Sequence, residues 1–193
     1  MVLFATVFAT VLVTYFAWHI TKNSVENSAE QDFLNIVNDS NDAITQRMLD
    51  YTIALDSGVG LLRSSDVPVT RTGWKKFTDS LKLRTQFAGI QGLGYAVIVP
   101  PDEKLDFERK IRAEGFPDFA IKPPGDRDPY SAIVYLEPFD FRNQRAFGFD
   151  MYSEPIRREA MQSAARTGLA TVSGPVTLVQ ETDEDIQRGF LMY

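Results

Sequence analysis

The residues best suited to do chemistry lie within the stretch GFDMYSEPIRREAM, residues 148–161. Asp150 stands before a Ser-Glu-Pro turn, and Arg157 and Arg158 follow the turn side by side. Acids and arginines this close together are typical of an active site, of a clamp for an anionic ligand, or of the polar first turn of an ordinary helix. The choice among the three depends on the elements that hold these side chains.

The turn and the residues after it predict a helix that begins with Ser153 as its N-cap and ends before Gly168 as its C′ residue. Consecutive residues point about 100° apart around a helix, so the two arginines cannot face one direction. One can face the sheet while the other faces solvent. On spacing alone, two solvated arginines are the simpler interpretation, and Asp150 is expected to anchor the turn.

Catalysis has few candidate residues in this sequence. There is no cysteine, and the single histidine, His19, lies in the apolar N-terminal run, so histidine-based and thiolate-based sites are excluded from the rest of the chain. Glu137, Asp140 and Asp150 follow neighbouring predicted strands and could converge as glycosidase acids do. Because their spacing is not specific, we expect them to serve turns or pair with arginines, and we predict no catalytic residue.

Metal, cofactor and nucleic-acid binding are also not predicted. The acidic stretch ETDEDIQR, residues 181–188, lacks the alternating oxygen ligands and the glycine of a calcium loop. Gly92 and Gly94 offer only G-x-G, with no phosphate loop after them. The formal net charge of −6 belongs entirely to the residues after position 21, and an acidic domain repels a phosphate backbone.

The first twenty residues, MVLFATVFATVLVTYFAWHI, carry no charge. As a helix they would span about 30 Å, which is the thickness of a bilayer core. A signal peptide would need a basic start and a small-x-small cleavage site, and neither is present. We therefore expect residues 1–21 to form a transmembrane helix in contact with the lipid bilayer, with a buried core helix as the alternative.

A long helix is predicted over residues 22–65. No proline occurs before residue 68, and apolar or small residues recur with 4-3 spacing, interrupted by Asn41. This pattern favours a stalk that makes a homodimer through a coiled-coil seam. The alternative is a helix that packs on its own domain. The seam positions are Val37, Ile44, Met48, Tyr51, Leu55, Gly58 and Leu62.

Residues 66–193 mix predicted helices and strands without strict alternation, which favours an α+β domain built on an antiparallel sheet. Strands are expected near residues 93–100, 130–139, 144–152 and 171–181, and a further strand begins near residue 188. Tyr130 and Tyr135 on the second of these could line an apolar pocket or simply pack the sheet. The chain stops inside this last apolar strand, so we expect it to be a fragment of a longer protein.

Several motifs in order resemble the CHASE domain, an extracytoplasmic sensory domain of receptor histidine kinases and nucleotide cyclases. They are GIQGLGYAVIVP, the run from LDFERKIRAEG to MQSAARTG, and VSGPVTLVQE, and the resemblance covers roughly residues 70–193. It implies a stalk helix, a membrane-distal PAS-like module that binds the ligand, and further parts that this chain does not contain. Those are a membrane-proximal module, a second membrane helix and an output domain.

The resemblance also implies ligand-binding positions. In the cytokinin receptors of the family, an aspartate of the helix after the G-x-D motif binds the adenine ring, and the matching position here is Arg157. An arginine cannot accept those hydrogen bonds and suits a carboxylate or phosphate instead. Cytokinin is therefore not expected, and an anionic small molecule is. The other ligand-binding positions that we predict are Val179, Ser173, Phe190 and Met192, together with Tyr130 and Tyr135.

These observations lead to one main function and two alternatives. The main one is a membrane-anchored sensor domain of a bacterial inner-membrane protein, periplasmic or extracellular. It would bind a small ligand without a cofactor and signal to a histidine kinase or diguanylate cyclase. The alternatives are a membrane-tethered hydrolase that uses paired carboxylates and a coiled-coil assembly protein.

Overall fold

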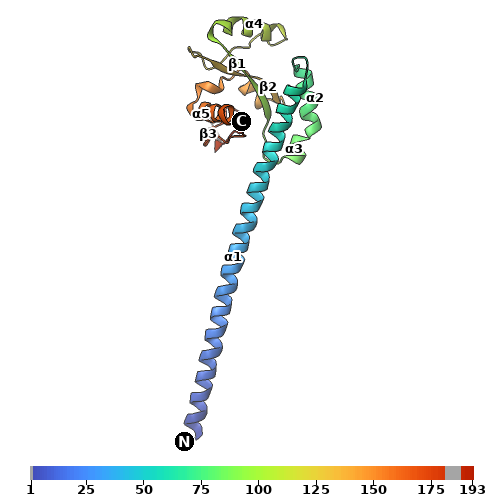
Figure 1. The fold of residues 1–193 in the computed structure, drawn as a ribbon. Coiled ribbons are helices and arrows are strands. Elements are labelled where there is room, and N and C mark those ends of the chain that lie inside the picture. Colours follow the sequence, from blue (N-terminus) through green and yellow to red (C-terminus); the bar gives the residue numbers. More distant parts are fainter. Residues whose placement is uncertain (1, 181–187) are drawn as a thin grey trace. The chain divides into compact units, whose positions relative to one another are not determined.

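The computed structural model of the chain describes residues 2–180 and 188–193 (Figure 1). Packing divides the chain into two compact units, Met1–Met48 and Leu49–Tyr193, and each is described by itself. The division expected at residues 65 and 66 stays a prediction.

The described residues of the unit Met1–Met48 form a single helix. Its residues belong to α1, which runs from Val2 to Ser64 without a proline to interrupt it. Thr10, Thr14 and Ser40 donate their hydroxyls to the carbonyls four residues before them, so these polar side chains are satisfied within the helix. The described side chains of this unit are almost all exposed, because a lone helix has nothing to bury them against.

The expectation of a transmembrane helix over residues 1–21 is wrong. Over the residues that the structure describes, no helix has an apolar stretch long enough to cross a bilayer.

A two-stranded antiparallel sheet lies at the centre of the unit Leu49–Tyr193. Strand β1, Leu93–Val99, pairs with β2, Tyr130–Glu137, from Leu93 opposite Glu137 to Val99 opposite Tyr130, with a bulge between Tyr95 and Ala96. Both segments are rich in β-branched and aromatic residues, which favour strands. A second sheet joins β3, Val176–Thr177, to β4, Arg188–Gly189.

Helices make up most of the remaining regular structure. The α-helices of the unit besides the end of α1 are α2, Arg71–Leu81; α3, Leu83–Gln86; α4, Lys104–Ala113; and α5, Pro155–Thr167. Three 3₁₀ turns are η1, Pro101–Glu103; η2, Asn143–Ala146; and η3, Met151–Ser153. The described chain is thus mostly helical with two small sheets, and the predicted α+β, PAS-like antiparallel module is wrong.

One of the expected strands is absent from the described residues and another is much shorter than expected, for local reasons. Residues 144–152 begin within the turn η2, and Gly148 then takes a φ of 79°, which an extended strand does not allow. What remains is one isolated bridge of Phe149 to Lys122 and one of Asp150 to Ala132. Near residues 171–181, Gly174-Pro175 removes a backbone donor, and the strand shrinks to β3.

Among the described residues of this unit, the core consists of three hydrophobic clusters. The first packs α4 on one face of the β1–β2 sheet and includes Val99, Ile111 and Tyr130. The second contains Ile133, Leu136, Ala146 and Met151, with Ala96, Phe149, Met161, Val179, Leu191 and Tyr193 against it. The third joins the end of α1 to α2 around Trp74, Leu83 and Leu93.

Candidate functional site

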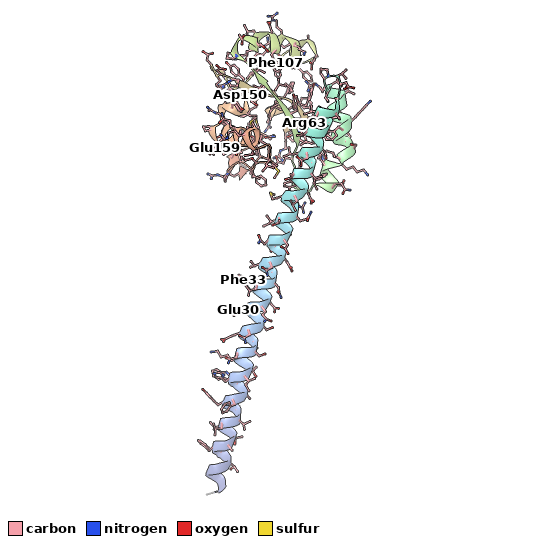
Figure 2. All side chains as sticks on the ribbon, viewed as in Figure 1. Glu30, Phe33, Arg63, Phe107, Asp150 and Glu159 are labelled. Atoms are coloured by element: carbon pink, nitrogen blue, oxygen red, sulfur yellow. The ribbon has the colours of Figure 1, made fainter. Side chains whose placement is uncertain are left out.

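Asp150 holds the turn that leads into α5 and is fully buried (Figure 2). Its carboxylate accepts hydrogen bonds from the backbone N–H of Ser131 at 2.8 Å and of Tyr152 at 3.0 Å, and from Arg127 Nε. A buried carboxylate with this many donors has its hydrogen-bonding capacity satisfied within the fold. Asp150 therefore anchors the turn, as the sequence indicated.

Helix α5 begins one residue later than the sequence indicated. The N-cap is Glu154, whose carboxylate accepts from the backbone N–H of Ile156 at 3.1 Å and of Arg157 at 2.8 Å. Ser153 instead donates its hydroxyl to Asp150 O at 2.6 Å. At the other end Gly168, with a φ of 68°, closes the helix as predicted.

The two arginines of α5 face in different directions. Arg158 is exposed, whereas the side chain of Arg157 is only 4% exposed. The simpler interpretation of two solvated arginines is therefore wrong for Arg157. Its guanidinium donates from Nη2 to Thr177 O at 2.9 Å and from Nη1 to Met151 Sδ at 3.6 Å, and it lies 4.9 Å from the centre of the Phe149 ring.

The positive charge of Arg157 is poorly compensated. Its ion pair with Glu154 is long, 3.9 Å from Nε to Oε2, and the Glu154 side chain is partly exposed. The Nε group is buried and has no hydrogen-bond partner among the described residues. Burial lowers the pKa of Arg157, and the nearby Tyr193 and Glu154 only counter part of that effect. A buried charge with so little compensation is normally destabilising.

Tyr193 brings a second buried donor to the same place. Its hydroxyl also has no partner among the described residues, and its electrostatic interaction with Arg157 places the two groups near each other. Burial raises the pKa of Tyr193, so the hydroxyl keeps its proton at neutral pH. An acceptor-only group, such as a carboxylate or phosphate oxygen, would satisfy both free donors.

The sequence-predicted residues fall into two groups. Arg157 and Val179 lie together: Val179 and Tyr193 belong to the hydrophobic cluster that contains Met151, the partner of Arg157. Ser173 is also buried, but its hydroxyl bonds to the backbone. The hydroxyl accepts a hydrogen bond from Leu191 N at 3.0 Å and donates one to Gly174 O at 2.8 Å.

Tyr130 and Tyr135 do not join this group. Tyr130 packs in the cluster on the α4 side of the sheet and donates its hydroxyl to Gly125 O at 3.1 Å. Tyr135 stacks on Tyr95 and donates to Val69 O at 3.0 Å. Tyr130 therefore packs the sheet, whereas Tyr135 packs the sheet and also lines a cavity, so each of the two roles that the sequence left open occurs.

In the last segment, the residues that face the cluster of Met151 are not the two that the sequence suggested, and the ligand-binding role of Phe190 and Met192 stays a prediction. Phe190 is 46% exposed and Met192 accepts a hydrogen bond from Thr52 Oγ1 at 3.7 Å, whereas Leu191 and Tyr193 face the cluster of Met151. Residues of one parity share a face in extended chain, so a shift of one residue exchanges the two faces. The sequence holds no signal that distinguishes the two choices.

The other acids proposed for catalysis serve turns. Glu137 Oε2 accepts from Phe139 N at 3.1 Å, and Asp140 Oδ1 accepts from Arg142 N at 3.2 Å and from Asn143 N at 3.1 Å. Within residues 2–180 and 188–193 no three acidic or histidine side chains come together as a metal site would require. Most of the acidic stretch 181–188 lies outside the described residues.

Comparison with known proteins identifies the family to which the chain belongs. A search of curated proteins found no match. The family model of the CHASE domain matches residues 68–193, which confirms the resemblance seen in the motifs. CHASE domains are extracytoplasmic sensory domains of signalling proteins, not catalytic ones. The match covers most of the chain, and the chain belongs to the CHASE domain family.

Proposed function

We propose that this chain is the sensory part of a signalling protein and that it detects a small anionic molecule bound between Arg157 and Tyr193. Binding would set the activity of a histidine kinase or nucleotide cyclase on the other side of a membrane, with the sensor periplasmic or extracellular. The observation that carries the proposal is the pair of buried donors, Arg157 Nε and the Tyr193 hydroxyl, that lack acceptors among the described residues.

An anion is favoured because it would remove the main electrostatic defect of this region. The guanidinium is buried with one ion pair of 3.9 Å, and the surrounding cluster is apolar. Charge-assisted hydrogen bonds to a carboxylate or phosphate are stronger than neutral ones, and arginine binds such groups through two parallel bonds. An apolar surrounding further favours a ligand with a hydrophobic body beside its acid.

Entry of the ligand requires part of this region to open. The side chain of Arg157 is only 4% exposed, so a ligand cannot reach it from solvent in this conformation. The segment that covers it includes β3, and this strand pairs with β4 through only two residues on each side. So short a ladder is weak, and we expect β3 to move when the ligand enters.

A contact between the end of the chain and α1 provides a route for the signal. Met192 Sδ accepts a hydrogen bond from Thr52 Oγ1, and the next residue is Tyr193. A ligand that moves Tyr193 would shift this contact and favour one position of α1 over another. Helix α1 is thus the element through which the site would reach the rest of the protein.

We further propose that α1 pairs with its counterpart in a second copy of the chain. Val37 and Ile44 of the predicted seam are exposed in the unit Met1–Met48, and a helix with exposed apolar positions at 4-3 spacing is stabilised by a coiled coil. A homodimer would let a shift of one helix against the other carry the signal.

The binding site is tested by thermal unfolding of the whole chain with acetate, benzoate and inorganic phosphate as probes. We expect at least one anion to raise the Tm of the parent and of Arg158→Met, the exposed neighbour used as a matched control. Arg157→Met should abolish the rise. Tyr193→Phe removes one hydrogen bond to the charged ligand and should weaken binding by at least about tenfold.

The proposal would be wrong if Arg157→Met responded to the anions like the parent. It would be equally wrong if none of the three probes stabilised a well-folded parent chain. The second result would favour the alternative of a coiled-coil assembly protein, which needs no ligand.

A further inference from the structure

The side-chain hydroxyl of Ser131, on β2, is a further buried polar group without a partner. The residue is 0% exposed, and its Oγ makes no hydrogen bond with any described residue. The fold uses the backbone of Ser131, whose N–H donates to Asp150 Oδ1 at 2.8 Å, but not its side chain. A buried hydroxyl without a hydrogen bond costs free energy that an alanine in its place would avoid. The Ser131 hydroxyl therefore has hydrogen-bonding capacity left for a ligand.

This hydroxyl lies on the face of the β1–β2 sheet that carries the cluster of Met151. Alternate residues of a strand point to opposite faces of its sheet. Tyr130 and Ala132, on either side of Ser131, belong to the cluster on the α4 side. Ile133, two residues after Ser131, belongs to the cluster that contains Met151. Ser131 therefore points to the Met151 side of the sheet, as Ile133 does.

The contacts on this face lead from Ser131 to Arg157. Strand β2 contacts η3, the turn that begins at Met151, and Met151 Sδ accepts from Arg157 Nη1 at 3.6 Å. Further along β2, Ile133 N donates to Phe149 O at 3.1 Å, and the centre of the Phe149 ring lies 4.9 Å from the guanidinium. The unbonded hydroxyl of Ser131 and the unbonded Nε of Arg157 therefore border one buried region.

A ligand group that reaches Ser131 should be uncharged. The carboxylate of Asp150, which accepts from Ser131 N, is fully buried and already paired with Arg127. A second acid group at Ser131 would therefore be a buried negative charge next to a carboxylate, which is unfavourable. A ligand hydroxyl carries no such charge, and it can either donate to the serine hydroxyl or accept from it.

We propose that Ser131 is a ligand-binding residue and that the molecule sensed is a hydroxy acid. Its acid group would bind Arg157 and Tyr193, its apolar body would lie against the cluster of Met151, and its hydroxyl would bond to Ser131 Oγ. This inference rests on the anion site proposed above and adds the class of molecule to it. Arg157 would bind any acid of suitable size, and Ser131 would select those that carry a hydroxyl.

Isothermal titration calorimetry of the whole chain can test this selection with matched acids. Benzoate is compared with 3-hydroxybenzoate and 4-hydroxybenzoate, and 3-phenylpropionate with 3-(4-hydroxyphenyl)propionate. At least one hydroxy acid should bind the parent about fivefold tighter than its matched acid, as one additional neutral hydrogen bond would provide. Terephthalate, which carries a second acid group in place of the hydroxyl, should bind more weakly than benzoate.

Variants then assign the preference to one hydroxyl. Ser131→Ala should fold normally and bind each hydroxy acid no better than its matched acid. Thr78→Val is the control and should keep the full preference, because it removes a buried hydroxyl of α2 that is bonded within its own helix, to Trp74 O. Arg157→Met should bind none of the acids.

Two results would overturn the inference and leave the anion site standing. One is that the parent binds benzoate and 3-phenylpropionate but binds no hydroxy acid more tightly. The other is that Ser131→Ala retains the preference of the parent. Failure of every acid to bind a well-folded parent would overturn the anion site and this inference together.

Discussion

Two arginines on opposite faces of the β1–β2 sheet show how differently one residue type is stabilised in this domain. Arg71 donates to Val134 O at 2.7 Å and to Glu114 at 3.4 Å, and lies 4.3 Å from the Phe116 ring centre. Arg157 has a carbonyl and a ring as well, Thr177 O and Phe149, but the carboxylate of its ion pair is 3.9 Å away.

The difference runs against what stability alone would require. The side chain of Arg71 is 26% exposed and that of Arg157 is 4% exposed, so the more deeply buried charge has the weaker partner. Removing a charge from water costs more free energy the more deeply the charge is buried. The deeper arginine therefore has the greater need of a close carboxylate partner. The contacts of Arg71 within the fold are enough to stabilise its charge. Arg157, by contrast, has a hydrogen-bond donor left for a ligand.

The largest expected effect is the difference in stability between two variants in which one arginine or the other is replaced by methionine. Arg71→Met should reduce the free energy of unfolding by about 2–3 kcal/mol, because it removes the aromatic contacts and the charge-assisted bonds. Arg157→Met should reduce it by no more than about 1 kcal/mol, because removal of a poorly paired buried charge offsets the lost bond to Thr177. Urea denaturation of both variants measures the difference.

Arg158→Met provides the control for this comparison, since an exposed residue should change stability by less than about 0.5 kcal/mol. Equal losses for Arg71→Met and Arg157→Met would show that Arg157 is held as firmly as Arg71. The contrast between the two faces would then disappear.

A smaller effect is expected for two tyrosines, one from each face. The hydroxyl of Tyr135 donates to Val69 O, so Tyr135→Phe should lower stability by about 1 kcal/mol. The buried hydroxyl of Tyr193 has no partner among the described residues, so Tyr193→Phe should leave stability unchanged or raise it. Denaturation in the absence of any anion measures both, and a loss of about 1 kcal/mol in Tyr193→Phe would mean that its hydroxyl is satisfied after all.

Local rules predicted those parts of the fold that are decided by neighbours in sequence. Three features follow from such rules: β1 is an apolar run that ends before Pro100, α5 ends at a C′ glycine, Gly168, and the turn before α5 contains a short acid, Asp150. The ordered motifs sufficed to identify the family. Residues 144–152 were misjudged because Gly148, at a φ of 79°, interrupts a segment whose composition otherwise favours a strand.

The candidate site was less accessible to such rules, because it depends on which side chains meet across the fold. Spacing showed that Arg157 and Arg158 diverge but not which one is buried. The partners Thr177 and Phe149 come from segments that are distant from each other in sequence. Tyr193 was missed because the alternation of residues 190–193 can be read in two ways, and only packing against Met151 decides between them.

The smallest expected difference concerns stability at alkaline pH. Burial raises the pKa of Tyr193 in the folded chain. In the unfolded chain a tyrosine titrates near about pH 10, so the unfolded chain loses this proton at a lower pH than the folded chain does. The contribution to stability is fully present below that pH and is lost above it, because the unfolded chain then gives up the proton first. From about pH 10 to 11 the parent should lose about 1 kcal/mol relative to Tyr193→Phe.

The pKa of Tyr135 is raised as well, by burial first and then by Glu114, so its titration is superimposed on that of Tyr193 in the parent. Because Tyr135 is retained in Tyr193→Phe, the difference between the two denaturation curves isolates Tyr193. The difference in the free energy of unfolding between the two chains should not change with pH near neutrality, and it should begin to change only above about pH 10. Parallel curves up to pH 11 would mean that the Tyr193 hydroxyl is open to water, and Arg157 would then lose its proposed neighbour at the anion site.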